Sequence, residues 1–216
     1  MNLGLSVAAL AGVALAIAAA SVAPARRGNG ENLMIGNPAC GKNPGNAGHG
    51  TPLVATGKNQ LAIFAQGCFW GVEELFRKLP GVIDTTVGYT GGTLANPRYE
   101  DVKNGRTGHA ESLEILFDPQ KISYDEILDY FFRLHDPTTV NQQGNDRGTQ
   151  YRSIIFYHDE KQRQAAELAK TRAQAKWPRP IVTEIVPAAK FWPAEEAHQD
   201  YLQRIPWGYT CHYLRS

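Results

Sequence analysis

The sequence of 216 residues predicts an α+β domain, a two-layer sandwich in which helices pack on a mixed β-sheet. Three observations support this fold class. Short apolar strands and amphipathic helices mix along the chain without the regular alternation of a doubly wound fold. Apolar residues make up 43% and charged residues 20% of the chain, a normal globular balance. The length that remains after an N-terminal leader is set aside suits one domain.

The first 25 residues differ in composition from the rest. Residues 3–25 carry no charged side chain, and Ala18-Ala19-Ala20 offers a small-residue cleavage site, although no Lys or Arg precedes the apolar stretch. We expect residues 1–25 to be a signal peptide and the protein to be periplasmic or otherwise exported. The alternatives are an uncleaved membrane anchor, for which the stretch is long enough, and a cytoplasmic protein whose start codon is misplaced.

Residues 26–58 are rich in Gly, Asn and Pro and contain Cys40. Such a segment buries little apolar surface, so we expect a flexible tether. The folded catalytic domain is then expected over residues 59–216.

The N-terminal half of this domain predicts three strands and one helix. Residues 61–65, LAIFA, form the apolar run of a buried strand. Residues 69–79 predict a helix because their apolar residues fall on one face, and Pro80-Gly81 ends it. Residues 82–89 and 109–117 alternate as strands do.

The C-terminal half adds three helices and two strands. Ser123 and Glu126 form a capping box that opens a helix to about Leu134. The Gly- and Asn-containing residues 136–149 predict a loop. The remaining elements are expected as strands at 153–157 and 181–186, a long helix at 159–176 and a short helix at 195–203. We expect these elements to build a ferredoxin-like core.

Charge and cysteine content exclude several classes of protein. Basic and acidic residues number 22 and 21, so no basic excess predicts binding to nucleic acid. The three cysteines, Cys40, Cys68 and Cys211, are too few for a disulfide framework, and no Cys-x-x-Cys pair predicts a zinc site. We expect a monomer without a metal or an organic cofactor.

Cys68 lies between a predicted strand and a predicted helix. Unpaired N–H groups at the start of a helix stabilise an anion, so we expect the pKa of the thiol to be lowered and the thiolate to act as a nucleophile. A buried structural cysteine is the alternative. Phe69 and Trp70 favour the nucleophile, because large apolar side chains beside it could wall a pocket for a small apolar group.

Five motifs follow one another along the domain. They are GCFWG at 67–71, GYTGG at 88–92, NPxY at 96–99, GHAE at 108–111 and GNDRGTQYRS at 144–153. Together they resemble the motifs of the peptide methionine sulfoxide reductase A family, and the resemblance covers about residues 60–211. It implies repair of oxidative damage by reduction of methionine S-sulfoxide, both free and in oxidised proteins, through attack of Cys68 on the sulfoxide sulfur.

Glu111 is the predicted proton donor. It shares a strand face with Leu113, Ile115 and Phe117, where desolvation would raise the pKa of its carboxyl group. A protonated carboxyl group can protonate the sulfoxide oxygen as the sulfur is attacked. The alternative is a strand glutamate held in a salt bridge.

The resemblance also implies roles for five further residues. The hydroxyls of Tyr99 and Tyr151 hold the sulfoxide oxygen, Asp146 helps to bind the substrate backbone, and Phe69 and Trp70 cradle the S-methyl group. Without the resemblance, the two tyrosines could equally be core aromatics, and Asp146 a turn residue.

Cys211 lies in a Gly-containing C-terminal tail that we expect to be mobile. By resemblance it resolves the sulfenic acid left on Cys68, and thioredoxin or a thioredoxin-like dithiol carrier reduces the disulfide that forms. The family's common pattern places a further cysteine after this position, and here the chain lacks one. A relay through Cys40 is the alternative.

Two other functions remain open from the residues alone. Cys68 with a histidine, such as His198 or His212, would suit an acyl hydrolase. A lone oxidisable Cys68 would suit a redox sensor without turnover.

Overall fold

The structure is a computed structural model that describes Met1 and residues 52–216. Nearly all of the predicted leader, most of the tether and Cys40 lie outside the described residues. Within residues 52–216, no helix combines the length and the apolar character needed to cross a membrane.

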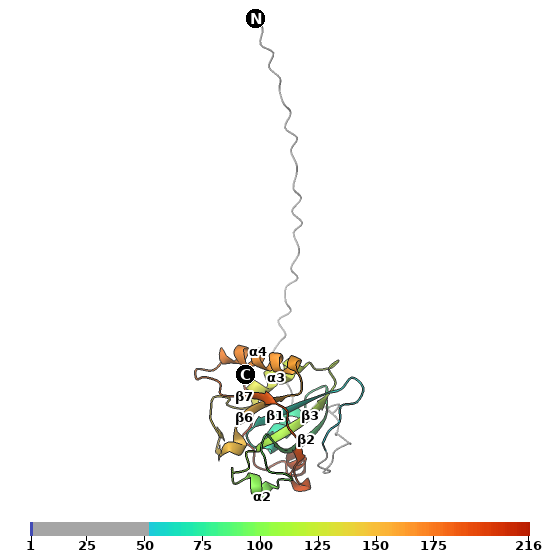
Figure 1. The fold of residues 1–216 in the computed structure, drawn as a ribbon, viewed down its shortest axis with the longest axis vertical. Coiled ribbons are helices and arrows are strands. Elements are labelled where there is room, and N and C mark those ends of the chain that lie inside the picture. The colour runs from blue at the N-terminus through green and yellow to red at the C-terminus, as the bar shows by residue number, and fades with distance from the viewer. Residues whose placement is uncertain (2–51) are drawn as a thin grey trace. The chain divides into compact units, whose positions relative to one another are not determined.

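The described chain forms a mixed sheet of six strands (Figure 1). The strands are β1 (Gln60–Gln66), β2 (Val82–Thr90), β3 (Ala110–Phe117), β6 (Ser153–Tyr157), β7 (Glu184–Pro187) and β8 (Trp192–Pro193). Their order is β7-β6-β1-β3-β2-β8, and β6 and β7 pair in parallel whereas the other neighbours pair antiparallel. The predicted mixed sheet is therefore confirmed.

Five α-helices accompany the sheet within residues 52–216. They are α1 (Phe69–Phe76), α2 (Tyr99–Val102), α3 (Tyr124–Leu134), α4 (Glu160–Gln174) and α5 (Tyr201–Arg204). The succession β1-α1-β2-β3-α3-β6, with β3 lying between β1 and β2, is the split βαβ arrangement of a ferredoxin-like fold. This confirms the predicted α+β sandwich.

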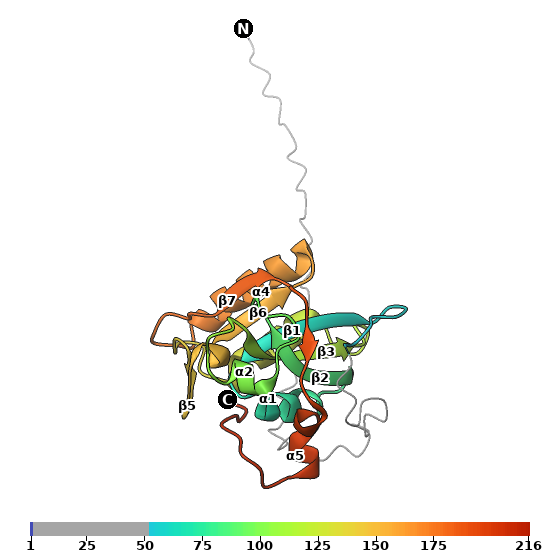
Figure 2. The same cartoon turned by 60° about the horizontal axis from the view of Figure 1, so that its bottom comes forward.

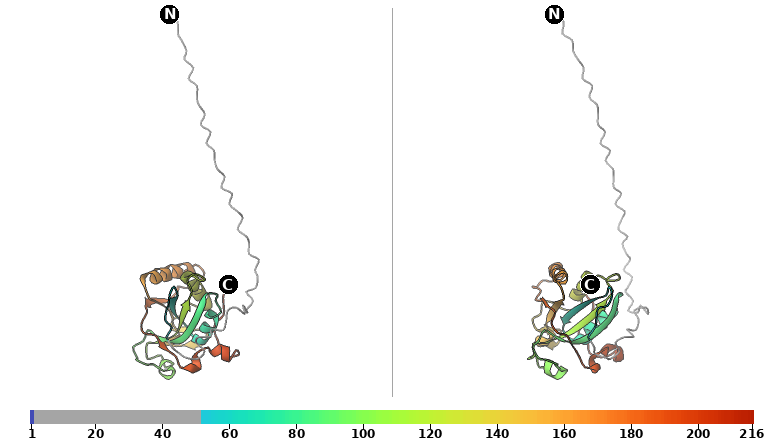
Figure 3. Two further views of the ribbon diagram at one scale, coloured as in Figure 1. Left: turned by 90° about the vertical axis from the view of Figure 1, so that its right-hand side faces the viewer. Right: turned by 45° about the vertical axis from the view of Figure 1, so that its right-hand side comes forward.

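The main apolar core lies between one face of the sheet and the helices (Figure 3). Phe64 of β1 and Leu113 of β3 pack in it with Val72 of α1, Phe131 of α3 and Ala169 of α4. Because side chains alternate along a strand, Ile63 and its neighbours form a second, smaller cluster of their own. Glu111 lies two residues before Leu113 in β3, so both side chains are on the same face of the sheet. The carboxyl group of Glu111 contacts the start of α1.

Several short elements were not predicted, and some predicted bounds are wrong. Helix α1 ends at Phe76, earlier than the predicted Leu79, and the strand predicted at 181–186 is β7, which runs over Glu184–Pro187. The sequence showed neither α2 nor β8, nor the hairpin of β4 (Gln142–Gln143) and β5 (Asp146–Arg147). Elements of two to four residues are too short to display a hydrophobic period.

The predicted helix at 195–203 is broken into a 3₁₀ turn (Glu196–His198) and α5. Gln199 is turned into the core, where its side chain bonds the backbone N–H and C=O of Val87. Asp200 follows with a positive φ of 50°, and its N–H donates to the buried carboxyl group of Glu73. These tertiary contacts interrupt the helical backbone.

The C-terminal tail differs from the expected mobile segment. Residues 205–216 contain no helix or strand, but they turn back from α5 past α1 (Figure 2). Nε2 of His212 lies 2.7 Å from the Gln66 carbonyl, and the Arg215 N–H donates to the Arg133 carbonyl at 2.9 Å. The tail is therefore docked on the folded unit.

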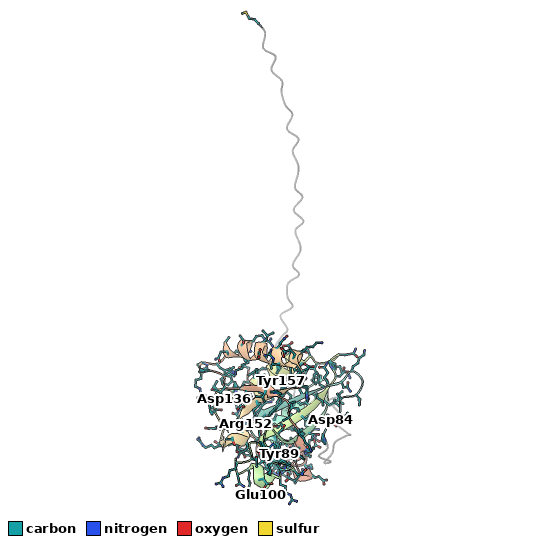
Figure 4. All side chains as sticks on the ribbon, viewed as in Figure 1. Asp84, Tyr89, Glu100, Asp136, Arg152 and Tyr157 are labelled. Atoms are coloured by element: carbon teal, nitrogen blue, oxygen red, sulfur yellow. The ribbon has the colours of Figure 1, made fainter. Side chains whose placement is uncertain are left out.

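One end of the sheet gathers the residues of interest. Tyr89 of β2 pairs with Glu111 of β3, and Figure 4 shows Tyr89 and Glu100 toward the end of the folded unit where α2 lies. Tyr157 lies nearer to α4 in the same view. In the view of Figure 2, α1 and the C-terminal end of the chain lie next to α2.

Candidate active site

The thiol of Cys68 stands at the head of α1, as the sequence predicts. Strand β1 ends at Gln66, Gly67 turns the chain with a φ of 99°, and Cys68 is the N-cap residue of α1. A Cβ on Gly67 would lie 2.6 Å from Cβ of Gln143, so both the backbone conformation and the space require glycine. The turn thereby aims Cys68 into the site, where it is 4% exposed.

A small cavity of about 90 Å³ opens beside this thiol. Its lining consists of Cys68, Phe69, Trp70, Tyr99, Glu111, Asp146, Tyr151 and Tyr209. The structure thus brings together every sequence-predicted site residue except Cys211, which lies just behind the lining. Tyr209 was missed, because its contact with Asp146, which brings it to the cavity, is not visible in the sequence.

Glu111 is almost completely buried, with 2% of its surface exposed. One carboxyl oxygen accepts a hydrogen bond of 3.1 Å from the Phe69 N–H. Burial raises the pKa of Glu111 to about 8, more than this hydrogen bond lowers it. The carboxyl group therefore carries its proton at neutral pH, which confirms the expected direction of the shift.

The expected lowering of the Cys68 pKa is wrong for the free site. Burial, followed by the proximity of Glu111, raises the pKa of the thiol well above its usual value, and the backbone N–H of Trp70 opposes this only in part. Desolvation of the anion thus outweighs the helix start. The thiol is therefore protonated at neutral pH in the free site.

Two phenols face the same space. Burial raises the pKa of both Tyr99 and Tyr151, and the nearby Glu111 adds to the shift. Their hydroxyl groups consequently remain donors over the physiological range. Tyr99 is held in place at the start of α2 by its backbone N–H, which donates to Glu195 at 2.9 Å.

Trp70 forms an aromatic wall that the C-terminal region supports. Its ring stacks on Tyr201 with centroids 4.0 Å apart, and its indole N–H donates to Nδ1 of His198 at 3.2 Å. His198 also contacts the rings of Phe69 and Tyr99. The histidine considered above as a hydrolase base therefore supports the pocket wall.

Asp146 connects the cavity to the second thiol. The Tyr209 hydroxyl lies 3.0 Å from both carboxylate oxygens, and the Cys211 thiol donates to one of them at 3.3 Å. The backbone N–H of Cys68 in turn points at the Cys211 sulfur and lowers the pKa of that thiol. Cys68 and Cys211 are both free thiols.

Glu73 of α1 ties the thiol helix to the broken helix of the C-terminal region. It accepts hydrogen bonds from the Thr85 hydroxyl at 3.4 Å and from the Asp200 N–H at 2.9 Å. Burial raises the pKa of Glu73 to about 8, and the charge of Asp200 contributes. The sequence did not reveal this group, because nothing in it shows that the helix face is covered.

We expect Glu73→Gln to stabilise the protein at alkaline pH. Because the folded pKa of about 8 exceeds the usual value of 4.5, the native state binds the proton more tightly, and this contribution to stability falls as the pH rises between those values. Within that window the variant should gain about 1.4 kcal/mol per pH unit over the parent. Urea denaturation at pH 5, 7 and 9 measures the difference. The exposed Glu196→Gln is the control, and a parallel pH dependence of parent and Glu73→Gln would contradict the assignment.

Within residues 52–216, no group of His, Cys, Asp and Glu side chains is arranged to hold a metal ion. No histidine in that range forms a hydrogen bond with the Cys68 thiol, as a hydrolase would require. A thiol that faces a protonated carboxyl group and two phenol donors is suited to attack a soft electrophile while its oxygen is protonated. Fold and site thus define a thiol-dependent oxidoreductase.

Comparisons with known proteins give the same class. The family model "Peptide methionine sulfoxide reductase" matches residues 60–216. The peptide methionine sulfoxide reductase MsrA of Mycobacterium sp. (strain MCS) is 54% identical over 159 residues, which cover 73% of this chain and 91% of the relative. Reduced Mxr1 from Saccharomyces cerevisiae is 41% identical with a TM-score of 0.73, over 76% of this chain and 96% of Mxr1.

A further solved structure is that of Mxr1 in complex with Trx2, which is 31% identical with a TM-score of 0.54 and covers 77% of this chain and 96% of that one. The chain belongs to the peptide methionine sulfoxide reductase family, as the family match and the close relatives establish. It is accordingly an enzyme that reduces methionine sulfoxide by thiol chemistry.

Proposed function

We propose that the enzyme reduces the S epimer of methionine sulfoxide, free and in oxidised proteins, with Cys68 as nucleophile and Glu111 as general acid. The observation that carries the assignment is the joint lining of one cavity by the Cys68 thiol, the protonated Glu111 and the two phenols Tyr99 and Tyr151. A cavity of about 90 Å³ suits a methyl sulfoxide group at the end of a side chain.

In the first step, the Cys68 sulfur attacks the sulfoxide sulfur. Glu111 protonates the oxygen as its bond to sulfur weakens, and Tyr99 and Tyr151 donate hydrogen bonds to it. Phe69 and Trp70 cradle the S-methyl group, and Asp146 contributes to binding of the substrate backbone. The oxygen ends on Cys68 as a sulfenic acid and methionine leaves. The proton that Cys68 loses replaces the one given by Glu111.

In the second step, Cys211 resolves the sulfenic acid. Its sulfur forms a disulfide with Cys68, and the oxygen leaves as water. The proximity of Cys211 to the Cys68 backbone supports this assignment. A thioredoxin-type dithiol then reduces the disulfide, a proposal that the solved complex of Mxr1 with Trx2 supports.

The test is an epimer-resolved assay. The reduced protein is incubated with the separate S and R epimers of a methionine sulfoxide peptide, with and without dithiothreitol, and the methionine product is measured by chromatography. We expect turnover of the S epimer in the presence of dithiol and at most a single equivalent of methionine without it. Equal rates for both epimers would refute the stereochemical assignment. Ester hydrolysis without dithiol would point to a hydrolase.

The chain's organisation is proposed as a signal peptide at 1–25, a tether at 26–58 and the catalytic domain at 59–216. The charge-free residues 3–25 and the family match over 60–216 support these bounds. Export would require a thioredoxin-like carrier outside the cytoplasm. N-terminal sequencing of the protein from cells tests the proposal, since a mature chain that begins at Met1 would contradict a cleaved signal.

A further inference from the structure

His212 stands beside the second thiol in a defined tautomer. Its Nε2 lies 2.7 Å from the Gln66 carbonyl oxygen. A carbonyl oxygen only accepts, so Nε2 carries the hydrogen and Nδ1 presents a lone pair. That Nδ1 lies 3.5 Å from Sγ of Cys211. The imidazole is thus oriented with its basic nitrogen toward the thiol.

The GCFWG motif at 67–71, which contains Cys68, also packs against His212. This histidine is 7% exposed and packs against the start of α1, where a Cβ on Gly71 would lie 2.8 Å from Nδ1. Gly71 therefore leaves room for the imidazole. The backbone N–H of His212 donates to the Thr210 hydroxyl at 3.1 Å, which fixes the turn between Thr210 and His212.

Cys211 needs a base, because burial and the Asp146 carboxylate raise the pKa of its thiol to about 12. A thiol of this kind contains almost no thiolate at neutral pH, and only the thiolate attacks sulfur. Burial lowers the pKa of His212 to about 4, so the imidazole is neutral and its Nδ1 lone pair faces the thiol. The same burial makes it a weak base in the resting site, and the negative charge that develops on the adjacent Cys211 sulfur during attack is what favours its protonation.

We propose that His212 is the general base that takes the proton from Cys211 as this thiol attacks the sulfenic acid on Cys68. The proposal rests on the resolving role of Cys211 proposed above. The Cys211–Cys68 sulfur bond forms and the bond between the Cys68 sulfur and oxygen breaks. Cys211 is oxidised and the Cys68 sulfur is reduced. The leaving oxygen takes up one proton, which balances the proton that His212 removed from Cys211, and departs as water.

Asp146 is the competing acceptor, since it lies 3.3 Å from the same sulfur. Its two oxygens already accept from the Tyr209 hydroxyl. A proton on His212 places a cation next to the new thiolate, whereas a proton on Asp146 leaves the thiolate without a counter-charge. The titratable and charged groups that face His212 are Asp146, Arg215, His135 and Cys211.

The experiment isolates the second step. Reduced enzyme receives one equivalent of a peptide containing methionine S-sulfoxide without a reductant, and rapid quench follows methionine release, the sulfenic acid trapped by dimedone, and the disulfide, from pH 6 to pH 9. In the parent, the rate of disulfide formation should be nearly independent of pH. In His212→Gln, which retains a donor for the Gln66 carbonyl, it should fall by about 10²–10⁴-fold at pH 7. It should then rise about tenfold per pH unit, as the thiolate fraction does.

Matched variants separate the outcomes. The amplitude of methionine release reports how much His212→Gln is folded, and His212→Asn provides a second variant with the same expected pH dependence. His158→Gln, at an exposed position between β6 and α4, should behave as the parent. A parent-like rate in His212→Gln overturns the proposal, and so does a slower rate with an unchanged pH profile, which would show that the histidine only positions the tail. If the rate of disulfide formation rises with pH in Asp146→Asn but not in His212→Gln, Asp146 is the base.

Cys211→Ser separates a failure of the role proposed for His212 from a failure of the resolving role proposed for Cys211. If this variant accumulates sulfenic acid while His212→Gln resembles the parent, the resolving role of Cys211 stands and the base is not His212. If Cys211→Ser still resolves the sulfenic acid at the parent rate, the proposed role of Cys211 itself fails.

Discussion

Replacement of Cys68 with serine should lower the rate of methionine sulfoxide reduction by at least about 10⁴-fold, as expected when a covalent nucleophile is removed. A serine hydroxyl ionises far less readily than a thiol and is a poor nucleophile toward sulfur. The side chain is 4% exposed at the N-cap position of α1, where serine is a preferred residue. The loss of activity should therefore come without a loss of fold.

The decisive measurement for Cys68→Ser is a single turnover without reductant, with thermal unfolding as the check on folding. Cys211→Ser is the matched control, since it removes the other thiol and should still release methionine once. Methionine release by Cys68→Ser, at a rate approaching that of the control, would show that Cys68 is not the attacking group.

For Glu111→Gln we expect a decrease of about 10²–10⁴-fold in the same step, the usual contribution of a general acid. The amide oxygen can still accept the Phe69 N–H that Glu111 accepts at 3.1 Å, so the start of α1 should keep its geometry. The amide has no acidic proton to give to the sulfoxide oxygen. Single-turnover methionine release measures the effect.

The pH profile tests the same assignment independently. The pKa of Glu111 is about 8, so the acid form dominates below that pH and disappears above it. The rate of methionine release in the parent should consequently rise with pH below 8, as the thiolate fraction of Cys68 grows, and level off above 8, where the loss of the acid form of Glu111 offsets that growth; this levelling should be absent from the residual activity of Glu111→Gln. A near-normal rate for the variant would remove Glu111 from the mechanism.

Local patterns predicted the framework of the fold. The apolar run of β1, the one-sided helix α1 and the capping box of α3 each lie within a few neighbouring residues, and the structure confirms all three. The capping box is complete, with the Glu126 N–H donating to the Ser123 hydroxyl at 3.2 Å. The helix expected at 195–203 failed, because the partners of Gln199 and Asp200 lie in β2 and α1.

The sequence predicted which residues form the site, but it predicted their pKa shifts only in part. The motif spacing and the family resemblance identified Cys68, Glu111 and Asp146, and all three line one cavity. The raised pKa of Glu111 followed from its apolar strand face. The pKa of Cys68 did not follow from the helix start, because the penalty of burial depends on everything packed around the sulfur.

By itself, the sequence determined the α+β class, the placement of a thiol after a turn glycine, and a carboxyl group on an apolar face. These features depend on short-range periodicity and on backbone requirements at single residues. Only the tertiary structure decided that Tyr209 and His198 support the pocket and that His212 presents Nδ1 to Cys211. Hydrogen bonds and desolvation act between atoms in space, and no spacing along the chain between Gln66 and His212 encodes the 2.7 Å that sets this tautomer.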